Sequence, residues 1–220
     1  MGQAVIFDLD GTLIDSAPDI HAASNTVLER HGIAPFNLAE ARGFVGHGAG
    51  VFIDRCLAAR GREGEAELRD QLLEGFLDLY EGAVYLTQLY PGVADCLAAL
   101  ASSGVPLGIC TNKPEGPTRA VMTHLGIMEH FEIIVGGDTL PVRKPDPAPL
   151  QEAMTRMSAR DVVYVGDSEV DAETAAAVGV PFALFTKGYR KAPVEDLVHD
   201  VRFDDFAALP GIVARHWATA

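Results

Sequence analysis

The sequence predicts an α/β fold: a doubly wound, Rossmann-like parallel sheet with an inserted all-helical domain. Two observations predict it. From Pro91 onward, segments with helical spacing alternate with short apolar segments, which is typical of a parallel sheet covered by helices on both faces. Before Pro91, only helical patterns follow the first apolar segment. We therefore expect a core domain of residues 1–14 and 86–220 and a helical cap domain of residues 15–85.

The inserted domain shows three helical patterns. Apolar residues recur at helical spacing between residues 17 and 32, where Gly32 ends the pattern. Residues 38–59 predict two short helices, because Gly-His-Gly-Ala-Gly at 46–50 interrupts the pattern. Residues 65–80 predict a further helix, and we expect no strand between 17 and 85.

The core elements follow in regular order. Val5–Phe7 forms the first expected strand, and a helix starting near Val93 precedes the second. The other expected strands are 105–110, 132–135, 162–166 and 181–185. The other expected helices are 115–125, 147–157, 169–178 and 204–217.

Composition excludes several classes of protein. The chain of 220 residues has a formal net charge of −14, and we find no basic patch of the kind that nucleic-acid binding requires. No apolar segment is long enough to span a membrane. Three scattered cysteines and the lack of a signal-peptide pattern favour a reducing, cytoplasmic location. Whether the chain is a monomer or a homodimer stays open.

Polar residues follow the ends of the predicted strands, where ligands bind in open α/β sheets. Four stretches of the chain supply them, and we expect them to meet at one edge of the sheet. They are Asp8 and Asp10; Thr111, Asn112 and Lys113; Lys144; and Asp167 with Asp171.

This set of residues suits phosphoryl transfer. The carboxylates of Asp8, Asp10, Asp167 and Asp171 offer the hard oxygen ligands that Mg²⁺ prefers. Lys144 supplies a positive charge, and Thr111 with the backbone N–H groups after it supplies donors for phosphate oxygens. Residues i and i+2 of a strand share a face, so Asp8 and Asp10 can act on one phosphate. One carboxylate can attack phosphorus, and the other can protonate the leaving oxygen and later activate water.

Each feature taken alone has an ordinary structural reading. Asp-x-Asp pairs are common, Thr-Asn-Lys is usual turn chemistry, and Asp171 could favour a helix N-terminus. Lys144 could be a solvated loop residue. The functional interpretation depends on their occurring together, each after a separate predicted strand.

These residues resemble the motifs of the haloacid dehalogenase-like superfamily, in the right order and over the whole chain. The matching stretches are Asp-Leu-Asp-Gly-Thr-Leu-Ile-Asp-Ser, Cys-Thr-Asn-Lys, Arg-Lys-Pro-Asp-Pro and Val-Gly-Asp-Ser-Glu-Val-Asp. The resemblance implies that Asp8 is the nucleophile and a Mg²⁺ ligand, and that Asp10 is the general acid/base and touches the metal through its carbonyl. It implies phosphate-stabilising roles for Thr111 and Lys144.

The same resemblance implies that Asp167 is a metal ligand and that Asp171 is a carboxylate next to the metal ligands that does not itself bind the metal. It also implies that residues 15–85 form a cap that closes over the active site. The presence of Asp10 separates the chain from the dehalogenases of the superfamily. The absence of lysine between residues 17 and 85 separates it from the phosphonate hydrolases.

Within the superfamily, the chain is most similar to bacterial phosphoglycolate phosphatases. This implies a small phosphorylated substrate, 2-phosphoglycolate. β-Phosphoglucomutases share the core motifs and are the alternative, and a non-catalytic phosphate-binding module is a remoter one.

The substrate carboxylate should meet a cation or N–H donors from the cap. We favour the loop of Gly46, His47 and Gly48, because glycine allows close backbone approach. Asn112, Thr111 and Lys144 complete the expected substrate-binding residues. Arg42, Arg55 and His21 are weaker candidates for the carboxylate.

Overall fold

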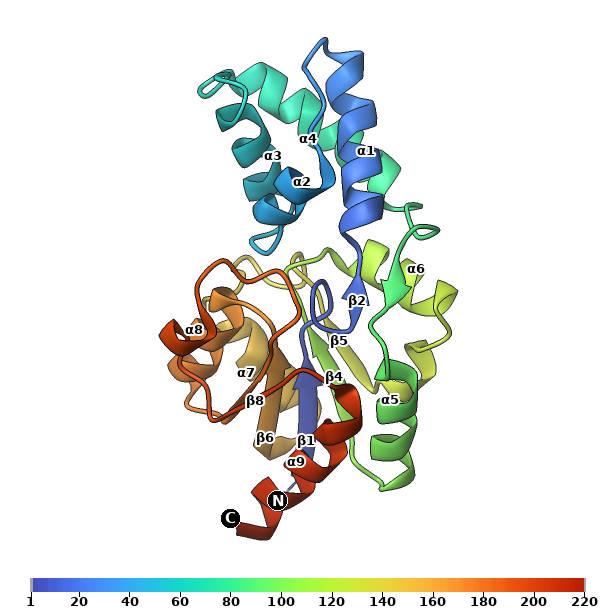
Figure 1. Cartoon of the computed structure of the whole chain (residues 1–220), viewed down its shortest axis with the longest axis vertical. Helices are drawn as coiled ribbons and strands as arrows, with labels where there is room; N and C mark the ends of the chain where they lie inside the picture. The colour runs from blue at the N-terminus through green and yellow to red at the C-terminus, as the bar shows by residue number, and fades with distance from the viewer. Residues whose placement is uncertain (1, 220) are drawn as a thin grey trace.

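The computed structural model describes residues 2–219, and its six-stranded parallel sheet confirms the expected α/β fold. The sheet lies in one half of the molecule and a group of helices in the other (Figure 1). The strand order is β5-β4-β1-β6-β7-β8, and every neighbouring pair is parallel. The strands are β1 (Gly2–Phe7), β4 (Leu107–Cys110), β5 (Ile133–Val135), β6 (Ala159–Gly166), β7 (Phe182–Phe185) and β8 (Val201–Phe203).

Alternation along the strands gives the sheet two apolar faces. On β1, Val5 and Phe7 join one buried cluster, whereas Ala4 and Ile6 join the other. The first cluster is covered by α5 (Val93–Ser102), α6 (Glu115–His124) and α9 (Leu209–Thr219). The second is covered by α7 (Ala148–Arg156) and α8 (Glu169–Val178). The central strands are therefore buried on both sides, as the apolar runs predicted.

Four helices form the other half of the molecule. They are α1 (Ala17–Arg30), α2 (Leu38–Phe44), α3 (Ala49–Ala58) and α4 (Ala66–Tyr80). Their apolar faces form a separate cluster, built only from residues of this segment. Stacked rings of Phe52, Phe76 and Tyr80 lie in it. No helix among the described residues is both long and apolar enough to cross a membrane.

A short antiparallel pair of strands connects the two halves. Ile14 and Asp15 of β2 (Ile14–Asp15) pair with β3 (Gln88–Leu89). Just beyond this pair, the buried Asp19 carboxylate accepts hydrogen bonds from the backbone N–H of Thr87 at 2.7 Å and of Leu86 at 3.0 Å. The outgoing and returning segments therefore lie side by side.

Two sequence expectations need correction. The strands β2, β3 and β8 were not expected. Two residues are too few to show a periodic pattern, and the three residues of β8 form no apolar run. The last helix was expected over 204–217, but α9 begins at Leu209. A separate 3-10 turn, Phe206–Ala208, precedes it, and the Asp205 carboxylate caps this turn by accepting from the Ala207 N–H.

Candidate active site

The carboxyl ends of neighbouring strands bring the predicted residues together. Asp8 follows β1, Thr111 follows β4 and Asp167 follows β6, and β1 lies between the other two strands. Lys144 comes from the loop between β5 and α7. All four side chains are buried. The site therefore lies at the edge of the sheet that faces the four helices of the other half.

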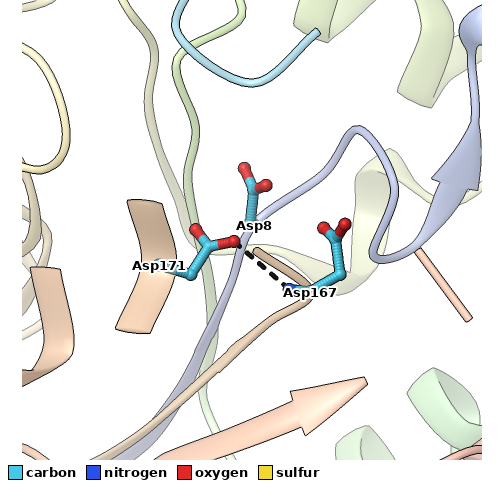
Figure 2. Close-up of side chains that lie close together, drawn as sticks. All are labelled: Asp8, Asp167 and Asp171. Atoms are coloured by element: carbon cyan, nitrogen blue, oxygen red, sulfur yellow. Dashed lines mark hydrogen bonds between the residues drawn. The ribbon is translucent and has the colours of Figure 1, made fainter. Parts of the chain in front are cut away.

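Three carboxylates form the centre of this site. One oxygen each from Asp8, Asp167 and Asp171 lie within 4.8 Å of one another. Figure 2 shows the carboxylates of Asp8 and Asp167 pointing to the same side, with Asp171 beside them. Asp171 lies in the first turn of α8, where its Oδ2 accepts from the Ser168 hydroxyl at 2.7 Å and from two backbone N–H groups.

Lys144 is the cation of this cluster. Its ammonium group donates to Asp171 Oδ1 at 2.7 Å and to the Tyr164 hydroxyl at 2.8 Å. It also lies 3.0 Å from Asp8 Oδ1, as an ion pair without hydrogen-bond direction. Asp171 and Tyr164 thus hold the lysine against Asp8, the position where the resemblance predicted a phosphate-stabilising charge.

One ammonium group does not balance three buried carboxylates. Burial raises the pKa of Asp8 to about 7, and the pull of Lys144 only partly opposes it. Burial and the charge of Asp171 also raise the pKa of Asp167. Burial would raise the pKa of Asp171 too, but Lys144 and the hydrogen bonds from Ser168 and Tyr164 hold it below its ordinary value. Without a further cation, burial and mutual repulsion therefore favour the protonated forms of Asp8 and Asp167.

A divalent cation fits this cluster. Asp8 Oδ1 is buried and accepts no hydrogen bond from any described residue, which is a cost that a coordinated cation removes. Asp167 is oriented by the Thr12 hydroxyl at 2.7 Å and by the Tyr189 N–H, and each of its oxygens keeps a free lone pair. Asp171, whose oxygens accept five hydrogen bonds, is better suited to hold Lys144 and the loop of Asp167 in place.

Asp10 has different surroundings from Asp8. Its Oδ1 accepts from the Ser16 hydroxyl at 2.6 Å and lies 3.5 Å from the ammonium group of Lys113. Lys113 is buried, and the ring of Tyr80 from α4 lies 3.9 Å from its Nζ. Burial lowers the pKa of Lys113, although Asp10 raises it again. Asp10 is therefore placed on the side of the site that faces the helices.

Thr111 and Asn112 have separate tasks. The Thr111 hydroxyl accepts from the Lys113 N–H at 3.2 Å, which leaves its own proton available to a ligand. The Asn112 amide donates to the Gly46 carbonyl at 3.0 Å and to the Lys144 carbonyl at 2.9 Å, and its oxygen accepts from the Lys144 N–H. The Asn112 side chain thus braces two loops, and only its backbone remains for the expected substrate contact.

Two glycines allow the loops to approach Asp167 closely. Gly11 has a φ of +91°, and a Cβ there would lie 2.6 Å from Asp167 Oδ2. A Cβ on Gly188 would lie 2.2 Å from the same oxygen. Real side chains do not tolerate these distances, so the carboxylate keeps its orientation only with glycine at both positions.

Two cavities open from the carboxylates toward the helices. The first is apolar on the helical side, and its lining includes Gly46, Gly48 and Tyr80 together with Thr111 and Lys113. The second has a volume of about 480 Å³, and its lining includes His47 from the loop between α2 and α3 and Arg55 from α3. Asp8 and Asp10 line both cavities. The predicted loop of residues 46–48 therefore faces the site.

The other candidates for the carboxylate lie elsewhere. Arg42 pairs with Asp15 at 2.6 Å. The His21 ring contacts the Phe36 carbonyl at 2.7 Å, inside the helical half. Neither residue is among those that line the two cavities.

Sequence reasoning missed three residues of the site. Lys113 was noted after its strand but given no role. Tyr189 and Lys191 follow β7 and reach the site from a loop. Tyr189 lies in Thr-Lys-Gly-Tyr-Arg at 186–190, and Lys191 directly follows it. The signal was the position of this stretch after the strand at 181–185, because the same rule identified the other residues.

Fold and site together define a hydrolase of the haloacid dehalogenase-like class. The family described as haloacid dehalogenase-like hydrolase matches residues 5–185, and the chain belongs to this family.

Its relatives include named enzymes. A phosphoglycolate phosphatase of Cereibacter sphaeroides (strain ATCC 17029 / ATH 2.4.9) is 50% identical over 212 residues, which cover 96% of this chain and 97% of the relative. A phosphoglycolate phosphatase of Rhodobacter capsulatus is 46% identical, with 97% of each chain covered. The crystal structure of a predicted phosphoglycolate phosphatase from Haemophilus somnus 129PT superimposes with a TM-score of 0.90 at 29% identity, over 96% of this chain and 97% of that one.

Proposed function

We propose that this protein is a Mg²⁺-dependent phosphatase that hydrolyses 2-phosphoglycolate to glycolate and phosphate. The observation that carries the reaction is the position of the buried Asp8 carboxylate. Its Oδ1 accepts no hydrogen bond from the described residues, Lys144 lies 3.0 Å from that oxygen, and Thr111 follows the neighbouring strand β4. The substrate follows from the relatives, which are named phosphoglycolate phosphatases and match this chain over nearly its whole length.

Asp8 acts as the nucleophile in this proposal. One of its carboxylate oxygens attacks phosphorus, and the bond between phosphorus and the glycolate oxygen breaks. Asp10 gives its proton to that leaving oxygen, so glycolate departs as the hydroxy acid. In the second step of the reaction, Asp10 takes a proton from water as the water oxygen attacks the phosphorus of the aspartyl-phosphate. Phosphate leaves, and both carboxylates return to their starting states.

The surrounding groups stabilise charge. Lys144 and the Thr111 hydroxyl face the phosphate oxygens, where negative charge develops. The carboxylates of Asp8 and Asp167 and the carbonyl of Asp10 would hold the divalent cation. When bound, the cation supplies positive charge beside the transferring phosphate. Asp171 acts through Lys144, which it holds in place.

Asp10 needs to exchange a proton, and its neighbours suit that task. Asp10 is more exposed than Asp8, and it accepts a hydrogen bond from Ser16 and contacts Lys113. Asp10 serves as the base in the second step of the reaction, and its contacts with Ser16 and Lys113 hold the side chain in place.

We further propose that residues 15–85 form a cap that moves on the core of residues 1–14 and 86–220. The burial of Asp8, Lys144 and Asp167 supports this, because movement of the cap helices would widen the path to Asp8. Closure would then exclude water other than the attacking molecule. The cytoplasmic location and the choice between a monomer and a homodimer stay predictions.

The test is phosphate release from a panel of small phosphate monoesters, with Mg²⁺ and with a chelator. We expect kcat/KM to be highest for 2-phosphoglycolate and activity to disappear with the chelator. The Asp8→Asn variant should fold normally and lose roughly 10⁴-fold or more in kcat. Substantial activity in that variant, with contamination excluded, would contradict the nucleophile assignment.

Two other outcomes would replace the proposed function. Formation of glucose 6-phosphate from β-glucose 1-phosphate, primed with the bisphosphate, would identify a phosphomutase. Metal binding without turnover of any ester in the panel would identify a phosphate-binding module.

A further inference from the structure

Three basic side chains meet at the second cavity from opposite sides. His47 and Arg55 come from the helical half, and Lys191 comes from the loop after β7 in the core. Asp8, Asp10 and Asp167 line the same cavity at its catalytic end. The basic cluster therefore lies outside the catalytic residues but within the space that a bound substrate would share.

Arg55 is a cation without a carboxylate partner. It is half-buried on α3, and its guanidinium donates to the Phe44 carbonyl at 2.8 Å. No ion pair with a carboxylate is found for it among residues 2–219. A half-buried guanidinium held only by neutral groups keeps a strong preference for an anion.

His47 adds a neutral donor beside this cation. The Arg55 guanidinium donates to His47 Nδ1 at 3.1 Å, which assigns the ring proton of neutral histidine to Nε2. Burial, with the positive charges of Arg55 and Lys191, lowers the pKa of His47 and so favours this neutral form. The Nε2–H then remains available as a donor.

Lys191 completes the cluster from the core side. Its backbone N–H donates to the Glu169 carboxylate at 2.7 Å, and the Ala192 N–H donates to the same oxygen. Glu169 therefore anchors the loop that carries Lys191. The Lys191 ammonium group itself forms no ion pair with any described residue.

The charges at this end of the cavity do not cancel. Arg55 and Lys191 contribute two positive charges, and Glu169, which also lines the cavity, contributes one negative charge. Two cations crowded into a partly buried space repel each other unless an anion lies between them. The phosphate of a substrate would occupy the other end, between Asp8 and Lys144, so the anion expected here is a second one on the same molecule.

We propose that Arg55 and Lys191 bind the carboxylate of the substrate, with His47 Nε2–H as a third donor. The assignment rests on the proposed function and extends it by naming the residues that determine specificity. Because Arg55 belongs to the helical half and Lys191 to the core, the carboxylate subsite is complete only when the two halves face each other. Substrate selection and cap closure are thereby the same event.

The experiment compares two substrates of equal length that differ only in this group. They are 2-phosphoglycolate and 2-hydroxyethyl phosphate, in which a CH₂OH group replaces the carboxylate. We expect Lys191→Met and Arg55→Gln each to lower kcat/KM for 2-phosphoglycolate by roughly 10- to 100-fold and to change it less than about threefold for 2-hydroxyethyl phosphate. Lys191→Arg should retain most of the discrimination.

Lys187→Met is the matched control. Lys187 lies on the same loop but is exposed, and its contact is with Asp204 at 3.7 Å, outside the cavity. This variant should behave as the wild type on both substrates. Equal losses on both substrates, or no loss on either, would overturn the subsite assignment. Failure of the wild type to hydrolyse 2-phosphoglycolate is a different result and would overturn the proposed function instead.

Discussion

Asp8 and Asp171 show how two buried carboxylates in contact with one lysine acquire different tasks. Asp171 accepts hydrogen bonds from Ser168, Tyr164, Lys144 and two backbone N–H groups, and its charge is thereby satisfied. Asp8 forms an ion pair with Lys144, and its Oδ1 accepts no hydrogen bond from any described residue. A carboxylate with so few donors keeps its lone pairs free, which is what a nucleophile and a metal ligand both require.

The raised pKa of Asp8 predicts how the metal-free protein responds to pH. Because the pKa is about 7 in the fold and 3.8 in the unfolded chain, the fold favours the protonated acid. The contribution of Asp8 to stability is complete below the unfolded value and is lost as the pH rises through the folded value. Binding of a divalent cation requires the ionised form, so we expect proton release on metal binding below pH 7 and tighter binding as the pH rises toward about 7.

Calorimetric titration of Mg²⁺ in buffers of different ionisation enthalpy measures the released protons directly. The Asp8→Asn variant is the control, and it should release fewer protons and bind the metal more weakly. In thermal unfolding without metal, the wild type should lose stability relative to this variant between about pH 4 and 7, the range between the two pKa values of Asp8. A metal affinity that does not change over this range would contradict the assignment of Asp8 as a ligand.

Which residues could be predicted depends on how they enter the site. Asp8, Thr111 and Asp167 directly follow strands with clear apolar patterns, so the sequence places them. Lys113 also follows a strand, but its burial depends on the ring of Tyr80, which comes from a helix 33 residues away along the chain. Lys191 lies on an irregular loop with no periodicity, and only the folded chain brings it opposite Arg55.

At the scale of elements, the site depends on how closely the loops after β4 and β5 approach each other. The Gly137 N–H donates to the Lys113 carbonyl at 2.8 Å. A Cβ on Gly137 would lie 2.2 Å from the backbone oxygen of Asn112. The loop of Thr111, Asn112 and Lys113 is therefore packed directly against the backbone at Gly137, where there is no space for a side chain.

We expect Gly137→Ala to damage both stability and catalysis. The added methyl group must displace the backbone of Asn112, at a cost of about 1–3 kcal/mol in the free energy of unfolding. The shift also moves Thr111, so kcat should fall by roughly 10- to 100-fold. Urea unfolding and steady-state kinetics of the folded variant measure the two effects.

Gly82→Ala is the control for this substitution. Gly82 lies between α4 and β3, and a Cβ there would meet nothing within 4 Å. The Gly82→Ala variant should have an unchanged kcat, and its free energy of unfolding should change by only a few tenths of a kcal/mol. If Gly137→Ala behaves in the same way, the loops are less tightly packed than the structure shows.

Element boundaries were predictable where packing follows a regular period. The helix at 169–178 was predicted at the observed residues, because its start is marked by Ser168 and Asp171, which form a capping box, and its end by Gly179 with φ +80°. The pair β2 and β3 was not predictable. Its two-residue strands form because the chain leaves for the helical half and returns from it at one place, and no local pattern encodes that contact.

At the scale of the whole molecule, two apolar cores meet over a polar site. The helical cluster shares no buried residue with the two clusters of the sheet. Polar contacts join the halves instead, such as Asn112 with the Gly46 carbonyl and Tyr80 with Lys113. Because separate cores can move relative to each other at low cost in buried apolar area, this arrangement favours opening and closing as rigid units.

Tyr189 links the segment between the two halves to the carboxylates. Its hydroxyl donates to Asp15 Oδ1 at 2.6 Å and accepts from the Ala17 N–H at 3.0 Å, where the chain passes into α1. Its own N–H donates to Asp167 Oδ2. One residue of the core thus holds the segment between the halves and orients the proposed metal ligand, so a change at either end reaches the other through a single side chain.

Tyr189→Phe should separate these two tasks, because it removes the hydroxyl and keeps the backbone N–H on Asp167. We expect a loss of about 1–2 kcal/mol in the free energy of unfolding and a KM for 2-phosphoglycolate that rises several-fold more than kcat falls. Amide hydrogen exchange should become faster in peptides that cover residues 14–22, where Ala17 loses its acceptor, while metal affinity stays close to that of the wild type.

Tyr85→Phe is the control, at a tyrosine that is 80% exposed, and it should change none of these quantities. If hydrogen exchange at residues 14–22 is unchanged in Tyr189→Phe, the hydroxyl does not restrain the connecting segment. If metal affinity falls together with the faster exchange, the two tasks of Tyr189 cannot be separated.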